Sequence, residues 1–169
     1  MKCLVVFAHP LPDSFGAAVH RTTLDTLRNA GHEVRDIDLY AIGFNPVLSP
    51  EERQNYIPNP QFNIDGLQEH VDALRWADTL VLVYPTWWGA QPAILKGWFD
   101  RVWANGVAYD VHDDGSTPTP RLTNVARVIA GAVTLQPQTV LGGVFGLIGE
   151  DISRAEARTE YNPRPPPGV

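Results

Sequence analysis

Apolar residues along the chain gather in four short runs that are separated by polar or helix-like segments. Residues 4–8 and 78–84 are almost continuously apolar, which is typical of parallel strands covered on both faces. Residues 32–39 alternate polar and apolar side chains, and this favours a strand at the edge of a sheet. Residues 125–133 form the fourth run. The pattern predicts four strands, with residues 78–84 at the centre of the sheet.

The segments between these runs have the periodicity of amphipathic helices. Asp13 and Ser14 can cap a helix that runs to about Asn29, and Asp65 can cap a second helix. Pro92 suits the first position of a third helix, because its missing N–H would be unpaired there. The expected apolar faces consist of Phe15, Ala18, Val19, Thr22, Thr26 and Leu27, then Leu67, Val71 and Leu74, then Ile94, Leu95, Trp98 and Val102.

Strands and helices alternate along the chain, and right-handed crossovers of this kind cover both faces of a parallel sheet. We therefore predict an α/β fold with a doubly wound parallel sheet in three αβα layers, formed by a single domain over residues 1–160. Residues 43–60 and 110–120 are rich in proline or polar residues and predict long loops. Residues 161–169 predict a proline-rich tail.

Composition narrows the class of protein without changing this fold. The chain has 169 residues, 44% of them apolar, and a formal net charge of −6 at pH 7. Without a basic surface, nucleic acid is not an expected partner. The single cysteine, Cys3, excludes an internal disulfide and fits a reducing compartment. The opening apolar run is too short for a signal core or a membrane span, so we expect a cytoplasmic protein without membrane insertion.

The loop after the first strand predicts a place where an anionic group can dock. It contains His9 and leads through Ser14 and Phe15 into the first helix, whose dipole and free N–H groups favour phosphate. Ser14 adds a hydroxyl and His9 an imidazole N–H. The loop lacks the glycines of the dinucleotide and Walker fingerprints, so a plain capped helix with Asp13 or Ser14 as its cap is the alternative.

A second loop, after the third strand, carries the adjacent residues Trp87 and Trp88. Neighbouring side chains of an extended segment point to opposite faces, so the two rings cannot both point inward. At least one ring is expected to be exposed or to lie against a ligand or partner. Flat apolar faces with little charge suit a planar ring system. The alternative is a core-facing aromatic pair beside a turn.

Three other features bear on the chemistry. Tyr109, which follows the third helix, can lie against a ring. The acidic residues beside His112 lack the pattern of a metal site, so no metal is expected. Ser14 and His9 suggest a hydrolase at first, but the chain has no nucleophile elbow.

Two motifs along the chain carry a family resemblance. The first motif is Phe7-Ala8-His9-Pro10 with Ser14-Phe15. The second is Tyr84-Pro85 and Trp88, followed by Pro92-Ala93-Ile94-Leu95-Lys96-Gly97-Trp98-Phe99-Asp100-Arg101-Val102. The second motif is long and highly specific. Together the motifs resemble the NAD(P)H:quinone oxidoreductase family, and the resemblance covers roughly residues 1–133. This flavodoxin-like group includes modulator-of-drug-activity proteins and ancillary subunits of potassium-efflux systems.

The resemblance implies a flavodoxin-like sheet, a bound FAD or FMN, and a homodimer with its active site at the subunit interface. The residues that it places at the flavin phosphates and ribityl chain are His9, Ser14 and Phe15. Those that it places along the isoalloxazine are Pro85, Thr86, Trp87 and Trp88. It also implies that Trp88 and Tyr109 shape the catalytic pocket for the nicotinamide and the quinone.

The mechanism that the resemblance implies is a ping-pong transfer of two electrons. NAD(P)H gives a hydride to N5 of the flavin and leaves. A quinone then binds in the same place and accepts two electrons. The protein contributes mainly orientation and electrostatics, while the flavin carries the chemistry.

The sequence departs from the family after the fourth strand. The family carries a Thr-Thr-Gly-Gly-like turn at the flavin and then a fifth strand, whereas here Val133-Thr134 leads into Leu135-Gln136-Pro137. Two alternatives therefore stay open. One is a non-catalytic, flavin-binding regulatory partner of a membrane transport system. The other is a degenerate member that binds flavin weakly or not at all.

Overall fold

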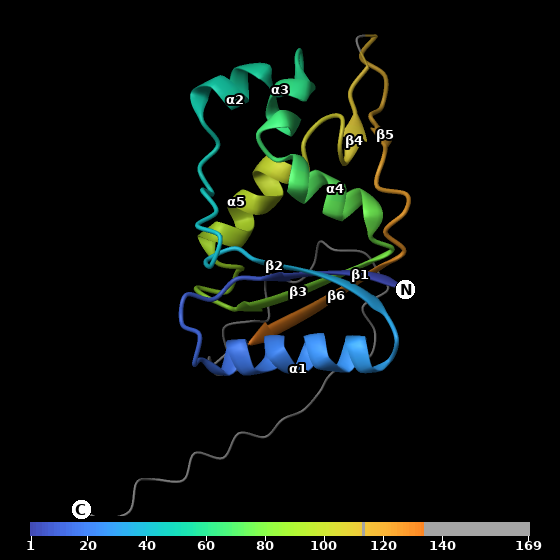
Figure 1. Ribbon diagram of the computed structural model, residues 1–169. Coiled ribbons are helices and arrows are strands. Elements are labelled where there is room, and N and C mark those ends of the chain that lie inside the picture. The colour runs from blue at the N-terminus through green and yellow to red at the C-terminus, as the bar shows by residue number, and fades with distance from the viewer. Residues whose placement is uncertain (113, 134–169) are drawn as a thin grey trace, which may run out of the picture. The chain divides into compact units, whose positions relative to one another are not determined.

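A computed structural model describes residues 1–112 and 114–133 of the protein (Figure 1). Four parallel strands form one sheet in the order β2-β1-β3-β6. Their bounds are Lys2–Phe7 (β1), Glu33–Asp38 (β2), Thr79–Pro85 (β3) and Arg127–Val133 (β6). The predicted parallel sheet is confirmed, with β2 at one edge and β3 between β1 and β6. The predicted boundary at residue 160, the tail and the departures after Val133 lie outside the described residues.

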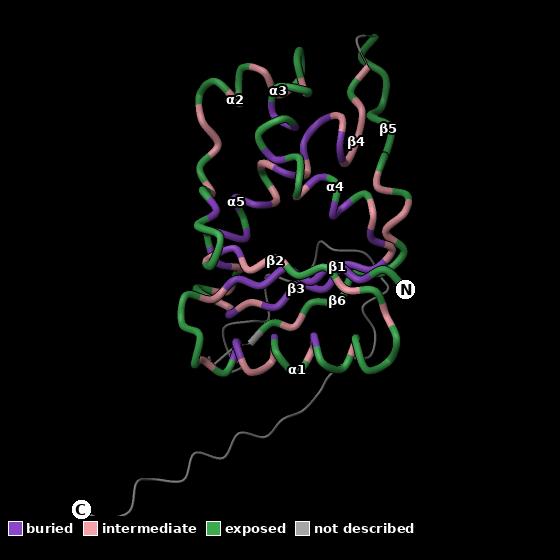
Figure 2. The backbone as a smooth tube through the Cα atoms, in the orientation of Figure 1, coloured by how far each residue is buried: buried purple, intermediate pink, exposed green. Residues whose placement is uncertain are grey.

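Helices cover both faces of the sheet, which confirms the three αβα layers (Figure 1). Helix α1, Phe15–Asn29, lies on one face, and α4, Gln68–Trp76, and α5, Ala93–Val102, lie on the other. Alternate residues of the central strands β1 and β3 pack against the helices on opposite faces of the sheet. Val5, Phe7, Val81 and Val83 pack in the cluster with α1, and Leu4, Val6, Leu80 and Leu82 pack in the cluster with α4 and α5. Strands β1 and β3 are therefore buried along most of their length (Figure 2).

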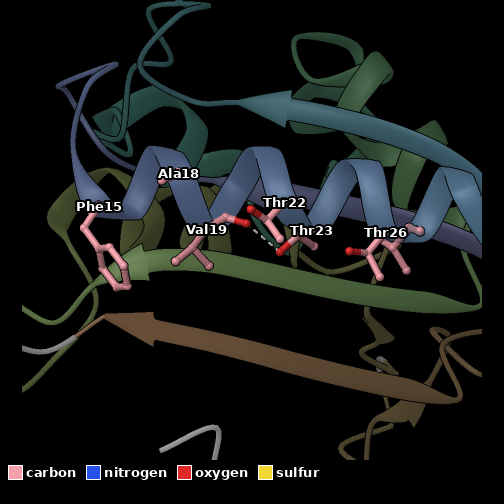
Figure 3. Close-up of a pocket in the computed structure, with 7 residues that line it drawn as sticks. Phe15, Ala18, Val19, Thr22, Thr23 and Thr26 are labelled. Carbon is pink, nitrogen blue, oxygen red and sulfur yellow. Dashed lines mark hydrogen bonds between the residues drawn. The ribbon is translucent and has the colours of Figure 1, made fainter. Parts of the chain in front are cut away.

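The face of α1 that packs on the sheet matches the predicted one only in part, since Val19 and Leu27 of the predicted set pack against the cluster beneath the helix. The buried residues of the helix are Gly16, Ala17, His20 and Leu24. The predicted apolar set, together with Thr23, lines an open groove of about 380 Å³ (Figure 3). The pattern left out the buried residues Ala17 and Leu24, and it left out His20 because histidine counts as polar. In the fold, His20 stacks on Phe7 with ring centroids 4.3 Å apart, and its Nε2 lies 2.7 Å from Asp36 Oδ1. This partner offsets the cost of burying the imidazole.

Residues 43–60 are not the single long loop that was predicted. They contain helix α2, Pro50–Asn55, and end where α3, Pro60–Asp65, begins. Ser49 Oγ accepts the Glu52 N–H at 3.1 Å, and the Glu52 carboxylate accepts the Ser49 N–H at 2.7 Å. This reciprocal capping box satisfies two N–H groups at the start of α2. Two of the prolines in this segment, Pro50 and Pro60, start helices, where their missing N–H costs nothing.

Two predicted helix starts are displaced. Asp65 ends α3 instead of capping α4, and its carboxylate accepts a hydrogen bond from Gln61 Nε2 at 2.6 Å. Helix α4 begins at Gln68 without a side-chain cap. Pro92 is the N-cap of α5 and not its first residue. The predicted inner face of α5 is confirmed, since Ile94, Leu95, Trp98 and Val102 are all buried.

The segment predicted as a polar loop at residues 110–120 takes part in a short antiparallel ribbon. Strand β4, Tyr109–Asp110, pairs with β5, Thr119–Pro120. Arg121 Nη1 donates to both carboxylate oxygens of Asp110, at 3.0 and 3.1 Å. The ribbon and this ion pair fix the backbone on either side of Tyr109.

Acidification is expected to destabilise the protein through His70 on α4. The ring meets the edge of Phe44, and its Nδ1 accepts the indole N–H of Trp98 at 3.3 Å. Burial lowers the pKa of His70, while nearby Glu69 raises it and Arg101 lowers it. The unfolded chain therefore takes up this proton at the higher pH. Stability is full above the ordinary histidine pKa of about 6.5 and falls as the pH drops below it.

Urea unfolding on either side of this pKa measures the effect. We expect the His70→Asn variant, which keeps an acceptor for Trp98 but does not titrate, to lose less stability on acidification than the wild type. An equal loss in both proteins would show that His70 does not carry the pH dependence.

Candidate functional site

The two loops predicted to bind a ligand lie side by side at the carboxyl edge of the sheet. They follow β1 and β3, which are paired in parallel with Phe7 opposite Val83. The N–H of Ala8 extends this pairing by donating to the Val83 carbonyl at 3.0 Å. The rings of His9 and Trp87 then lie 6.1 Å apart between centroids, tilted by 60°. The fold joins the His9 loop and the tryptophan loop into one site.

The polar side chains of Ser14 and His9 make hydrogen bonds within the loop after β1. Ser14 Oγ accepts the Ala17 N–H at 3.1 Å and donates to the Leu11 carbonyl at 2.9 Å. Ser14 is therefore the cap of α1, and its hydroxyl proton is used inside the loop. His9 Nδ1 accepts the Leu11 N–H at 3.0 Å. In the neutral ring the proton consequently lies on Nε2, which can donate to a ligand.

The start of α1 offers two more donors. Within the part of the chain that the structure describes, the N–H groups of Phe15 and Gly16 make no hydrogen bond. The start of α1 lies against His9, since a Cβ atom on Gly16 would be in ordinary van der Waals contact with His9 Cδ2, at 3.5 Å. Two backbone N–H groups, an imidazole N–H and the positive end of a helix dipole thus gather at one place, and this arrangement favours an anion.

The tryptophan loop is a tight two-residue turn. Trp87 and Ala90 exchange both backbone hydrogen bonds, at 2.9 and 3.1 Å. Trp88 and Gly89 occupy the central positions with φ angles of 52° and 76°, as a type I′ turn requires. The turn leaves Trp87 42% and Trp88 97% exposed. The prediction that at least one of the two rings is exposed is confirmed.

Replacement of Trp88 by asparagine is expected to stabilise the ligand-free protein. A positive φ costs most residues that carry a Cβ about 1–2 kcal/mol, and asparagine tolerates it far better than tryptophan. The exposed ring buries almost no area that the substitution could lose. Urea unfolding should therefore show a gain of up to about 1 kcal/mol for Trp88→Asn. A loss of stability would show that the ring supports the fold.

Tyr109 lies apart from Trp88 within one chain. The tryptophan turn precedes the first residue of α5, whereas Tyr109 follows its last. A helix of 10 residues is about 15 Å long. Strand β4 accordingly lies near the top of Figure 1, away from the carboxyl ends of the sheet strands. The two residues predicted to shape one catalytic pocket are not brought together by this chain alone.

Tyr109 lies instead against Tyr56, which the sequence analysis did not single out. The Tyr56 hydroxyl donates to the Asp100 carbonyl at 3.1 Å. Burial, reinforced by Tyr109 and Asp100, raises the pKa of Tyr56 to about 12. Tyr56 falls in the segment predicted as a loop. The capping-box signature ahead of α2 was the signal that could have placed it at the end of a helix.

None of the described helices has both the length and the apolar character needed to cross a membrane. Residues 1–112 and 114–133 also contain no group of three or more His, Cys, Asp or Glu side chains placed to hold a metal ion.

A doubly wound parallel sheet with loops gathered at the carboxyl ends of its central strands defines a class of α/β proteins that bind ligands at this edge. A family model described as having a flavodoxin-like fold matches residues 1–133. The chain belongs to this flavodoxin-like family.

Relatives and solved structures agree with this assignment. The chain is 41% identical over 117 residues to an uncharacterized NAD(P)H oxidoreductase of Haemophilus influenzae, covering 69% of the chain and 57% of the relative. It is 31% identical over 125 residues to human ribosyldihydronicotinamide dehydrogenase (quinone), with coverages of 65% and 54%. An NAD(P)H:quinone oxidoreductase structure from Methanothermobacter marburgensis matches with a TM-score of 0.69 and 32% identity, covering 83% of the chain and 70% of that structure. The chain spans about half the length of the curated relatives it matches.

Proposed function

We propose that the protein is a flavin-dependent NAD(P)H:quinone oxidoreductase, with FAD or FMN as its cofactor. The observation that carries the proposal is the placement of the His9 loop beside the turn of Trp87 and Trp88. The names of the matched relatives, which are NAD(P)H oxidoreductases and quinone dehydrogenases, support it.

The donors and rings at this site fit the two ends of a flavin. The N–H groups of Phe15 and Gly16 and the Nε2–H of His9 would hold the phosphate. The exposed tryptophan turn would give the ring system a flat apolar surface. Within the described residues, the N–H groups of Trp88 and Gly89 make no hydrogen bond, so they can donate to the polar edge of the ring.

The remaining predicted residues have supporting parts in this proposal. Ser14 acts by shaping the start of α1, because its hydroxyl is already bonded within the loop. Pro85 is buried at the end of β3 and Thr86 follows it, so both set the path of the backbone that would run along the isoalloxazine. Phe15, which is 61% exposed, would lie beside the ribityl chain.

The chain's own contribution to the reaction is binding and orientation. The bound flavin would supply the redox chemistry, accepting a hydride at N5 from NAD(P)H and returning two electrons to a quinone in a ping-pong sequence. The tryptophan turn would hold the ring plane, and the donors at α1 would fix the ring's position along the site. No described side chain needs to act as a nucleophile.

The separation of Trp88 and Tyr109 supports a homodimer in this proposal. If both residues shape one pocket, a second copy must bring its Tyr109 to the first copy's tryptophan turn, because α5 keeps them apart within a chain. A two-fold dimer would contain this pocket twice, once at the tryptophan turn of each copy.

Mixed dimers of Trp88→Ala and Tyr109→Phe chains test this arrangement. We expect each variant alone to have low activity. A mixed dimer would hold one pocket with both substitutions and one with neither, so it should recover about half of the wild-type activity. Absence of any recovery would place Trp88 and Tyr109 in separate pockets.

Anaerobic reduction of the flavin-loaded protein tests the proposed activity. The visible flavin absorbance should bleach when NADH or NADPH is added and return when a quinone follows. A protein that binds flavin but is not bleached by either nucleotide would instead be a regulatory flavin-binding module. A protein that binds no flavin would be a degenerate member of the family.

A further inference from the structure

Asp38, the last residue of β2, carries a carboxylate oxygen that the fold does not use. Its Oδ1 accepts the N–H groups of Tyr40 and Ala41, at 3.1 and 3.0 Å, and this closes the turn after the strand. Within the part of the chain that the structure describes, Oδ2 makes no hydrogen bond. The turn needs only one oxygen atom, which an asparagine would supply equally well. The second oxygen of Asp38 is therefore available to a ligand.

The register of the sheet places Asp38 beside the start of α1. Phe7 lies opposite Asp38 and packs in the cluster with α1, so Asp38 is on the same face of the sheet. Asp36, on that face too, reaches the helix, since its Oδ1 lies 2.7 Å from His20 Nε2. Asp38 comes two residues later, about 6.6 Å closer to the carboxyl edge. Going back four residues from His20 along α1 leads about 6 Å in the same direction, to Gly16.

The parts of the site follow the order of the strands along the edge of the sheet. The tryptophan turn follows β3, the N–H donors of α1 follow β1, and Asp38 ends β2, while the sheet order is β2-β1-β3. The Leu39 N–H donates to the Phe7 carbonyl and the Ala8 N–H to the Val83 carbonyl, both at 3.0 Å. These bonds hold the three strand ends side by side. A ligand that crosses this edge would meet a ring surface, then phosphate donors, then a hydrogen-bond acceptor.

FAD carries its chemical groups in that order, whereas FMN ends at its phosphate. Beyond the two phosphates of FAD comes a ribose, whose hydroxyl groups can donate a hydrogen bond. In dinucleotide-binding α/β folds an acidic residue that follows the phosphate loop accepts such a bond. We infer that Asp38 is a specificity-determining residue, whose Oδ2 accepts a hydrogen bond from the adenosine ribose and so selects FAD over FMN. The inference rests on the proposed function, in which a flavin occupies this edge of the sheet.

The negative charge of Asp38 acts in the same direction as this hydrogen bond. The terminal phosphate of FMN has a second pKa of about 6 and is largely a dianion at neutral pH. Each phosphate of FAD carries a single charge, because both are bonded within the diphosphate. A carboxylate beside the start of α1 therefore opposes the phosphate of FMN more strongly than either phosphate of FAD.

Titration of Asp38→Asn with FAD and with FMN tests this inference. Asparagine keeps the Oδ1 acceptor of the turn but presents an NH2 group in place of Oδ2. Loss of a hydrogen bond to a charged group should weaken FAD binding by about tenfold or more. FMN binding should stay equal or become tighter. Equal losses for the two flavins, or no loss for FAD, would overturn the inference.

Asp25→Asn is the matched control for this titration. It removes one negative charge from an exposed position of α1, beyond His20 from the start of the helix, and should change neither affinity. Urea unfolding of both flavin-free variants should show wild-type stability for Asp38→Asn, because the turn keeps its acceptor.

Displacement of bound FAD by ADP and by 2′,3′-dideoxy-ADP tests the ribose contact without relying on a variant. ADP should displace FAD from the wild-type protein at about tenfold lower concentration than the dideoxy nucleotide, whereas Asp38→Asn should not distinguish the two. Equal displacement by both nucleotides in the wild type, or none by ADP, would overturn the inference and leave the proposed function intact. A wild-type protein that binds neither FAD nor FMN would overturn both.

Discussion

Replacement of Gly97 by alanine is expected to destabilise the protein more than any other single-methyl change in α5. A Cβ atom at position 97 would lie closer than 3.0 Å to the carbonyl oxygen, Cα and Cβ of Pro46. These are mostly backbone atoms, so no flexible side-chain end can move aside. The segment that leads into α2 would have to lift away from the helix. Overpacking of this kind costs about 3 kcal/mol or more when the backbone must shift.

The matched control for this prediction is Gly66→Ala. Gly66 has a φ of −74°, and a Cβ atom there would meet nothing within 4 Å. The control should change stability by less than about 0.5 kcal/mol or raise it slightly. Urea unfolding of both variants without flavin measures the difference. If Gly97→Ala were as stable as Gly66→Ala, the close packing of Pro46 on α5 would be refuted.

The second large effect is expected on flavin binding and not on stability. Trp88→Ala removes a ring that is 97% exposed, so the unfolding free energy of the flavin-free protein should change by less than about 0.5 kcal/mol. Stacking of an aromatic side chain on a planar ligand is worth about 1–3 kcal/mol. Flavin affinity should accordingly fall by about 5- to 150-fold.

Phe62→Ala supplies the comparison for Trp88→Ala. Phe62 is a partly exposed aromatic residue on α3, which is not part of the proposed site. Its loss should leave flavin affinity unchanged. Equal flavin affinity in Trp88→Ala and the wild type would show that the exposed ring does not contact the cofactor.

Much of this fold could be predicted from residue patterns, because the strong signals in it are local. The dense apolar runs at residues 4–8 and 78–84 lie in buried parallel strands. Two adjacent tryptophans after a strand required exposure of at least one ring by geometry alone. The His9 loop and the tryptophan loop could be placed together because the carboxyl ends of neighbouring parallel strands share one edge of the sheet.

The features that the sequence did not predict depend on partners far away in the chain. His20 is buried because its ring stacks on Phe7 and its Nε2 hydrogen-bonds with Asp36. No local sequence pattern contains that information. The helices at residues 50–65 are an exception, because the capping box of Ser49 and Glu52 at the start of α2 is a local signal that the prolines of this segment outweighed. Tyr109 was assigned to the same pocket as Trp88 by resemblance, but the length of α5 separates the two within one chain.

The most direct test of the central claim is a titration of the flavin-free protein with FAD and, separately, with FMN. We expect saturable binding of at least one of them, accompanied by quenching of tryptophan fluorescence as the ring covers the exposed turn. Under the same conditions Trp88→Ala should bind more weakly and show a smaller quench. No saturable binding of either flavin by the folded wild-type protein would contradict the assignment of the His9 loop and the tryptophan turn as a flavin site.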